Sequence, residues 1–199
     1  MSLPGHLIAF EGLDQSGKQT QAEQLRDYLA GRGQDCTLVS FPDYETPVGK
    51  EIAQALHSER DYAPDVMQLL YVTNRYEKRP AIQSWIDAGT IVLCDRYLAS
   101  SVAYGEAQGL DPEWLTHIQR YLPPPSLTIL LDIAPETAVR RKAAGRDRYE
   151  RDLDLLSRVR KSYERQALAA SWLRLDGERP KDDVARDIIQ AVSTRLLPR

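Results

Sequence analysis

A short segment near the N-terminus places two glycines and a lysine in an order that suits anion binding. It runs Gly12-Leu-Asp-Gln-Ser-Gly17-Lys18 and follows the apolar residues 7–10. Glycines let the backbone wrap closely around an anion, so that several N–H groups point at one phosphate, and the lysine adds a mobile positive charge. The segment therefore predicts a loop that binds a nucleoside triphosphate, between a buried strand and a helix. An ordinary turn is the alternative.

Three polar residues in and after this loop bear on metal binding. Where such a loop normally places Ser or Thr directly after the lysine, to hold Mg²⁺, this chain has Gln19. Thr20 is one residue out of register, though it could still reach a phosphate. Asp14 lies inside the loop, where it suits the acceptor or a bound Mg²⁺, whose charge reverses the repulsion between carboxylate and phosphate. A solvated turn acid is the alternative for Asp14.

A second group of polar residues, Asp95-Arg96-Tyr97, directly follows an apolar run. The carboxyl ends of parallel strands are where such folds bind ligands. An aspartate there can act on metal-bound water, and an arginine can hold a phosphate with two hydrogen bonds. Tyr97, Ser101 and Tyr104 follow at helical spacing, which predicts three hydroxyls on one face. A structural ion pair at the strand end is the alternative.

Tyr71 and Arg75 stand one helical turn apart. An aromatic ring beside an arginine suits a nucleobase, because the ring stacks on the base and the arginine hydrogen-bonds its edge. Core packing with a surface salt bridge is the alternative for this pair.

Arginine and lysine crowd around Gly145, within residues 140–150. This pattern predicts a mobile basic flap between two helices. Arg and Lys clamps on a transferring phosphoryl group supply much of the catalysis in phosphoryl transfer, and a closing flap excludes water. A solvated helix face is the alternative.

The elements that position these groups alternate along the chain. Short apolar runs bounded by breakers predict strands at 7–10, 37–41, 91–95, 128–133 and, less clearly, 172–175. Helical spacing predicts a helix from the loop to Gly31, one from an Asp65 N-cap to residue 87, one opening at Pro135, and two more at 150–169 and 182–196. This alternation predicts the α/β class: a three-layer α/β/α sandwich around a five-stranded parallel sheet, with the flap as a small lid.

Length and composition bound the answer further. The 199 residues, 42% of them hydrophobic, suffice for one core, so we expect a single domain over 1–199 with the flap at about 140–150. A net charge of −3 argues against a nucleic-acid binder. The two cysteines suggest no disulfide framework, and no stretch could span a bilayer. We expect a cytoplasmic protein without membrane or nucleic-acid partners.

Several short motifs occur together in a specific order: Phe10-Glu-Gly-Leu-Asp14 with the loop, Phe41-Pro42, Asn74-Arg75, Asp95-Arg96-Tyr97 with Ser101 and Tyr104, and Arg148-Tyr149-Glu150. In this order and spacing the chain resembles the thymidylate kinase family of P-loop nucleoside monophosphate kinases. The resemblance runs from residue 7 to about residue 189. It implies transfer of the γ-phosphoryl group of Mg·ATP to dTMP, with ATP and dTMP as small-molecule partners, and a homodimer.

The resemblance also implies a role for each matching position. The implied dTMP site comprises Asp14, Phe41, Pro42, Tyr44, Tyr71, Arg75, Arg96, Ser101, Tyr104 and Tyr149. The implied ATP site comprises Gly12, Gln15, Ser16, Gly17, Lys18, Gln19, Thr20 and Arg141. Catalytic roles fall to Asp14, Lys18, Arg96, Arg146 and Arg148.

Within the dTMP site, the resemblance implies that Tyr71 stacks on thymine and Arg75 reaches its O4 atom. Tyr104 would crowd the 2′ position and so favour deoxyribose. Arg96, with Tyr44, would hold the monophosphate. On the donor side, Arg141 would lie against adenine.

Two loop positions depart from the family pattern. One class of members carries a catalytic arginine where this chain has Gln15, so the charge that neutralises the transition state is expected from Arg146 and Arg148 of the flap. Gln19 removes the usual hydroxyl ligand of Mg²⁺. We therefore expect the metal to be held or oriented, through water, by Asp14, Asp95 and Glu150.

Three other functions compete with this interpretation. A deoxynucleoside kinase, or a monophosphate kinase for another pyrimidine, would rebuild the pocket around Tyr71, Arg75 and Ser101. A regulatory GTPase would normally show an Asn-Lys-x-Asp motif, which the sequence lacks. A non-catalytic binding protein is favoured by Gln19 but opposed by Lys18.

The flap hypothesis predicts a kinetic signature. Arg146→Ala and Arg148→Ala should lower kcat much more than they raise the KM for dTMP, because the lost charge acts on the transferring group. Steady-state kinetics with dTMP and Mg·ATP measures both parameters. An unchanged kcat in the double variant would mean that the flap only shields the site.

Overall fold

The computed structural model describes residues 5–141 and 152–197 and contains a five-stranded sheet. Its strands are β1 (Leu7–Glu11), β2 (Cys36–Ser40), β3 (Ile91–Asp95), β4 (Leu127–Asp132) and β5 (Trp172–Asp176). All neighbouring pairs are parallel, in the order β2-β3-β1-β4-β5. The predicted five-stranded parallel sheet is thus confirmed, and the ends of every strand fall within one residue of the expected ones.

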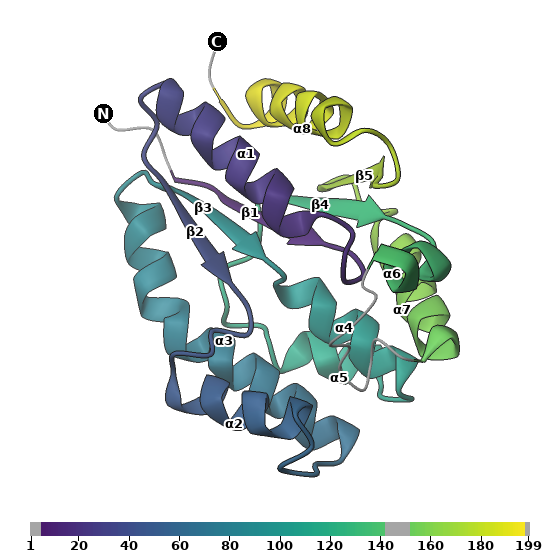
Figure 1. The fold of residues 1–199 in the computed structure, drawn as a ribbon. Coiled ribbons are helices and arrows are strands. Elements are labelled where there is room, and N and C mark those ends of the chain that lie inside the picture. The colour runs from purple at the N-terminus through teal and green to yellow at the C-terminus, as the bar shows by residue number, and fades with distance from the viewer. Residues whose placement is uncertain (1–4, 142–151, 198–199) are drawn as a thin grey trace.

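Helices cover both faces of the sheet, giving three layers (Figure 1). One face carries α1 (Lys18–Gly31) and α8 (Lys181–Arg195), and the other carries α3 (Pro64–Asp87), α4 (Leu98–Ala107) and α7 (Leu153–Gln166). Three shorter helices, α2 (Pro47–Leu56), α5 (Pro112–His117) and α6 (Pro135–Arg141), connect these elements. The α/β/α architecture is therefore confirmed. The predicted flap lies mostly in 142–151, outside the described residues.

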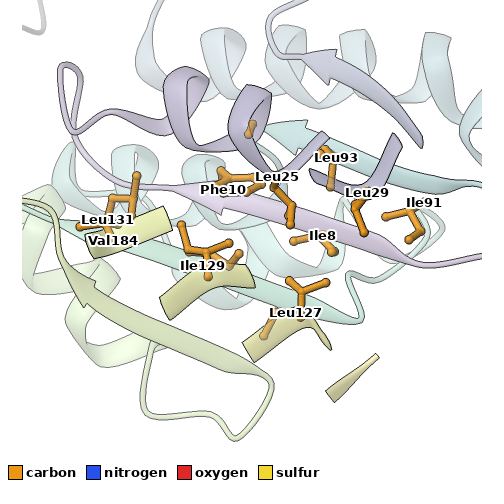
Figure 2. Close-up of a cluster of buried hydrophobic side chains, with 13 residues drawn as sticks. Ile8, Phe10, Leu25, Leu29, Ile91, Leu93, Leu127, Ile129, Leu131 and Val184 are labelled. Atoms are coloured by element: carbon orange, nitrogen blue, oxygen red, sulfur yellow. The ribbon is translucent and has the colours of Figure 1, made fainter. Parts of the chain in front are cut away.

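The core between the sheet and its α1/α8 face is shown in Figure 2. Ile8 and Phe10 of β1 point toward Leu25 and Leu29 of α1, with Val184 of α8 completing the cluster. The alternate residues of β1 face the opposite cluster, which includes side chains from α3. Every residue of β1 is buried, as expected for a central strand covered on both faces. This burial fixes where the strand's carboxyl end, and hence the glycine loop, can lie.

Some helix boundaries differ from the sequence-based expectations. The expected Asp65 N-cap is wrong: α3 starts at Pro64 with Ala63 in the N-cap position, because the fixed φ of proline suits the first helical residue. The short helices α2 and α5 were not expected. Each begins with a proline directly after an N-cap residue. The side chain of Thr46 accepts a hydrogen bond from the backbone N–H of Gly49, and that of Asp111 accepts one from the backbone N–H of Glu113.

Among the helices in the described ranges, none combines the length and the apolar character that crossing a membrane requires.

The core predicts a large cost for truncating Leu25, which is 1% exposed between α1 and the sheet. Leu25→Ala should lower the free energy of unfolding by about 2–5 kcal/mol, since it removes buried methyl groups and leaves a cavity. Urea denaturation followed by circular dichroism measures this. Leu168→Ala is the matched control, because Leu168 is 85% exposed, and should change stability by less than about 0.5 kcal/mol. Equal losses in the two variants would contradict the assigned core.

Candidate active site

The loop between β1 and α1 adopts a backbone shape that only glycine allows at its first position. Gly12 has φ 141° and Gly17 φ 95°. A Cβ atom on Gly12 would lie 2.5 Å from the carbonyl oxygen of Leu131 in β4, so a side chain fits neither the conformation nor the space. The loop thus turns tightly from the end of β1 into the N-terminus of α1. This strand–loop–helix arrangement is that of the P-loop NTPase fold.

Lys18 folds back into this loop. Its Nζ donates hydrogen bonds to the carbonyl oxygens of Gly12 at 3.2 Å and Leu13 at 2.9 Å, and the residue is 6% exposed. Burial lowers the pKa of Lys18, and the nearby positive charge of Arg96 lowers it further, while Asp14 opposes both effects. The ammonium group therefore lies within the loop, where a bound anion would offset its electrostatic repulsion with Arg96.

The remaining predicted donor-site residues lie around the loop in different ways. Gln19 turns its amide to Glu23, one turn further along α1, at 2.9 Å. Arg141, at the end of α6, donates to the carbonyl oxygens of Gln15 at 3.0 Å and Gly177 at 3.1 Å, and so joins α6 to the loop. Thr20 is exposed and Ser16 is buried. The loop's ligand-facing groups are therefore its backbone and Lys18 rather than the side chain of Gln19.

A cavity of about 240 Å³ opens beside the loop, between α3, α4 and the segment after β2. Every predicted acceptor-site residue that the structure describes lines it: Asp14, Phe41, Pro42, Tyr44, Tyr71, Arg75, Arg96, Ser101 and Tyr104. Tyr149 lies outside the described residues, as do Arg146, Arg148 and Glu150. Residues distant in sequence thus meet in one cavity of the size of a small ligand.

One end of the cavity is formed by Tyr71 and Arg75 of α3. Arg75 is 3% exposed, and its Nη1 donates to Ser101 Oγ at 2.7 Å. Its guanidinium lies 5.9 Å from the ring centroid of Phe41, and burial lowers its pKa. A cation held this deep, next to an aromatic wall, does not fit the alternative of a surface salt bridge. It suits recognition of a polar, flat group such as a nucleobase.

The other end carries Arg96, whose Nη2 donates to Asp14 Oδ1 at 2.7 Å and Tyr104 Oη at 3.3 Å. Its guanidinium also lies 5.2 Å from the ring centroid of Tyr104. Burial alone would lower the pKa of Arg96, but the charge of Asp14 and contacts with Tyr104 raise it well above its ordinary value. Arg96 is therefore a permanent cation at this end, suited to a phosphate.

The three-hydroxyl face expected from Tyr97, Ser101 and Tyr104 is not formed. Ser101 and Tyr104 line the cavity, but Tyr97 is fully buried and packs against Phe41, with ring centroids 5.8 Å apart. Tyr97 occupies the N-cap position of α4 with a non-helical backbone (φ −151°, ψ −134°), so its side chain does not follow the helical spacing of the other two.

The acidic groups near the loop allow only a limited kind of metal site. In the described part of the chain, no three His, Cys, Asp or Glu side chains are grouped to hold a metal ion directly. Asp95 Oδ1 is nevertheless buried and has no hydrogen-bond partner among the described residues, and Asp14 and Asp95 both raise the pKa of Lys18. An unsatisfied carboxylate oxygen beside the loop fits a hydrated Mg²⁺ that is held through water.

Comparisons with known proteins agree with this geometry. The family model "Thymidylate kinase" matches residues 10–188. A thymidylate kinase from Arabidopsis thaliana is 38% identical over 189 residues, which cover 94% of this chain and 71% of that protein. One from Schizosaccharomyces pombe is 35% identical over 194 residues, covering 95% and 92%. The solved thymidylate kinase structure from Candida albicans superposes with a TM-score of 0.83 at 29% identity, covering 98% of this chain and 93% of that one.

Sequence reasoning missed several residues of the cavity and its supports. Leu56, Gln68, Ser100 and Gln108 also line the cavity. Asn74 is fully buried and holds the segment after β2: its Oδ1 accepts from Asp43 N at 2.8 Å, and its Nδ2 donates to Thr46 Oγ1 at 2.8 Å. Gln68 stands one turn before Tyr71 on the same helix face, a signal that was available. Nothing in the sequence links Asn74 to Asp43.

The segment held by Asn74 is also tied to α3 by Lys78, whose Nζ lies 2.7 Å from Asp43 Oδ2. This hydrogen bond holds the pKa of Asp43 below its ordinary 3.8. A carboxyl group whose pKa is lowered by folding stabilises the protein above its unfolded pKa, and this stabilisation disappears as the pH falls through the folded pKa.

We therefore expect Lys78→Met to cost about 1 kcal/mol of unfolding free energy at neutral pH, and the difference from wild type to close as the pH falls below about 3.8. Urea denaturation of both proteins across this pH range measures the difference. Lys161→Met, at an exposed position of α7, is the control. A difference that stays constant with pH would contradict the role of the Asp43–Lys78 contact.

Proposed function

The chain belongs to the thymidylate kinase family, and from this membership we propose that it transfers the γ-phosphoryl group of ATP to dTMP, giving dTDP and ADP. The observation that carries the proposal is a single cavity beside a P-loop that is lined by two arginines on different elements, the buried Arg75 and the partly buried Arg96. One arginine suits a base and the other a phosphate, and the P-loop suits a second, larger phosphate group. A nucleoside monophosphate next to a nucleoside triphosphate meets all three requirements.

We propose one orientation for the acceptor in the cavity. Arg75 is the group we assign to the thymine O4, with Tyr71 stacking on the base and Ser101 near its edge. Arg96 we assign to the 5′-phosphate, together with Tyr44. Tyr104 lies between the two ends, within hydrogen-bond distance of Arg96, where it would crowd a 2′-hydroxyl.

The donor is assigned to the P-loop. Backbone N–H groups of residues 12–20 and the ammonium of Lys18 would bind the phosphates of ATP, aided by the N-terminus of α1. Arg141 lies over the same loop through its bond to the Gln15 carbonyl, which supports its assignment next to adenine. Asp14 contacts Arg96 at 2.7 Å and lies 4.0 Å from the Lys18 ammonium, which supports our assignment of its carboxylate to a position between the two proposed phosphate sites.

Mg²⁺ neutralises charge on the β- and γ-phosphates when it is bound. The residues we assign to it are Asp14 and Asp95, through water, with Glu150 as a third candidate from the sequence. The unsatisfied oxygen of Asp95 supports this assignment.

In the proposed reaction an oxygen of the dTMP phosphate attacks the γ-phosphorus of ATP in line with the leaving ADP. That oxygen is already anionic, so no strong general base is needed. The main task is to bring two anions together, and it falls to Lys18 and Arg96. Arg146 and Arg148 are our candidates for the charge on the transferring group, since Gln15 stands where part of the family carries an arginine.

Two further assignments complete the proposal. We propose that the enzyme acts as a homodimer, for which the exposed apolar side chains of Val66 and Leu69 on α3 offer a contact surface. We also propose a cytoplasmic location, supported by the free thiols of Cys36 and Cys94, which suit a reducing compartment. We treat the whole chain, 1–199, as one domain.

The phosphate role of Arg96 gives the central test. Arg96→Ala should lower the rate of dTMP phosphorylation by about 10²–10³-fold, because it removes the cation that holds the acceptor phosphate. ADP release in a coupled assay with Mg·ATP measures this. Arg186→Ala on α8, whose side chain is 74% exposed, is the matched control and should keep the wild-type rate.

The same assay run with thymidine, dCMP and dTMP tests the acceptor. We expect dTMP to be preferred. Preference for thymidine would instead indicate a deoxynucleoside kinase, preference for dCMP another pyrimidine monophosphate kinase, and no ADP release with any acceptor a non-catalytic binding protein.

A further inference from the structure

Both terminal nitrogens of the Arg96 guanidinium donate hydrogen bonds, and the partners of Nη1 lead to Glu11, a residue with no assigned role. Glu11 is the last residue of β1 and is fully buried. From its contacts we propose that Glu11 is a positioning residue: it acts through the hydroxyls of Ser100 and Tyr163 to fix the orientation in which Arg96 meets the acceptor phosphate. The inference rests on the proposed function.

Four neutral groups donate hydrogen bonds to the carboxylate of Glu11. Oε1 accepts from the backbone N–H of Tyr97 at 2.8 Å and of Ser100 at 3.3 Å. Oε2 accepts from Ser100 Oγ at 2.6 Å and Tyr163 Oη at 3.1 Å. Glu11 therefore caps the N-terminus of α4 from a neighbouring strand, where a negative charge is favoured by the helix dipole.

The direction of these hydrogen bonds determines what Arg96 encounters. The hydroxyls of Ser100 and Tyr163 lie 2.9 Å apart, so each proton points to Glu11 or to the other hydroxyl. A guanidinium can only donate, so neither hydroxyl turns its proton toward Arg96. Their lone pairs are then directed at Arg96 Nη1, which lies 3.2 Å from Ser100 Oγ and 3.4 Å from Tyr163 Oη. Positive guanidinium, two hydroxyls and negative carboxylate form a chain with consistent polarity.

The same carboxylate fixes the backbone beneath Arg96. Arg96 has φ 62°, a left-handed conformation that costs energy for a residue with a side chain. Its own N–H bonds the carbonyl oxygen of Phe10 at 2.9 Å, and the next N–H, of Tyr97, bonds Glu11. Two consecutive residues of β1 thus hold the turn in which Arg96 lies.

As a result both terminal nitrogens of the guanidinium are held by protein partners. Nη1 donates to the two hydroxyls and Nη2 to Asp14 and Tyr104, and of these four partners Ser100, Asp14 and Tyr104 line the cavity. An arginine with a long flexible side chain is in this way presented in one orientation before the phosphate arrives. Such preorganisation reduces the entropy lost on binding.

A purely structural role for Glu11 is the competing explanation, and comparing two ligands separates the two. Thymidine and dTMP share the base and sugar and differ only in the phosphate. Misplacing Arg96 should weaken dTMP alone, whereas general damage to the cavity should weaken both. The quantity to measure is the ratio of the two dissociation constants, by calorimetry, for wild type and each variant.

Tyr163→Phe is the principal variant, because it deletes one hydroxyl of the chain and keeps the ring. We expect its affinity for dTMP to fall about tenfold, the loss typical of one hydrogen bond to a charged group, with thymidine changed less than about twofold. Ser100→Ala should act in the same direction. Glu11→Gln should act more strongly, because its amide nitrogen donates to the hydroxyls and reverses their polarity.

Tyr97→Phe is the matched control. The Tyr97 hydroxyl is also buried, but it has no hydrogen-bond partner within the described residues, so its removal should leave both affinities unchanged. Arg96→Ala is the reference: it should remove most of the preference for dTMP over thymidine. If Arg96→Ala leaves that preference intact, the proposed function is wrong.

Suppose that Arg96→Ala removes the preference. The positioning role is then overturned if Tyr163→Phe and Ser100→Ala leave the affinity for dTMP unchanged, or if they lower the affinities for dTMP and thymidine equally. Thermal denaturation of each variant accompanies the measurement. If Glu11→Gln fails to fold, the two hydroxyl variants still decide between the explanations.

Discussion

The constraint that shapes this molecule is the need to hold several cations close together in a buried cleft. Lys18 and Arg75 are buried and Arg96 is partly buried, and the positive charge of Arg96 is among the causes that lower the pKa of Lys18. Such a cluster repels itself until anions arrive. Acidic side chains offset this cost: Asp14 contacts Arg96 directly, and Glu11 is linked to it through hydroxyls. These carboxylates thus reduce the repulsion among the cations while the phosphates are absent.

The sheet topology brings these charges together at one edge of the sheet. β1 lies between β3 and β4, and Phe10 pairs in register with Asp95. The residue after the end of β3, Arg96, therefore lies next to the loop that follows β1. The chain runs from β1 to β2 on one side of the sheet, and after β3 it crosses to β4 on the other side of β1, so the strand order reverses at β1 and a crevice opens at the carboxyl ends of the strands. The loop follows β1 and Arg96 follows β3. Because these neighbouring strands are parallel, both lie at the same edge of the sheet, beside the cavity.

The sequence predicted the parts of this arrangement that depend on local pattern. Buried strands are recognisable in the sequence as apolar runs. Residues that follow the carboxyl ends of parallel strands, such as Asp14 and Arg96, must meet at the same edge of the sheet. The direction of the Tyr97 side chain was not predicted, because Tyr97 is the N-cap of α4 and its backbone is not helical. Contacts such as Asn74 with Asp43 or Tyr163 with Glu11 join residues far apart in the chain. They depend on how helices pack over the sheet, which periodicity does not encode.

The two glutamines of the loop show how the surrounding fold compensates for departures in a motif. Gln15 contributes its carbonyl oxygen to Arg141, and Gln19 gives its amide to Glu23 on the surface of α1. Neither interaction directs a side chain at the centre of the loop, which is occupied by Lys18 and the backbone. Any further charge required by phosphoryl transfer must then come from outside the loop. Arg141 is the last residue of α6 and hydrogen-bonds the loop through the carbonyl oxygen of Gln15. The segment 142–151, which contains further basic residues, follows it directly in the sequence. In the proposed function the cationic role falls to Arg146 and Arg148 of that segment and the metal to Asp14 and Asp95, so that the loop itself would need only its backbone shape and one lysine.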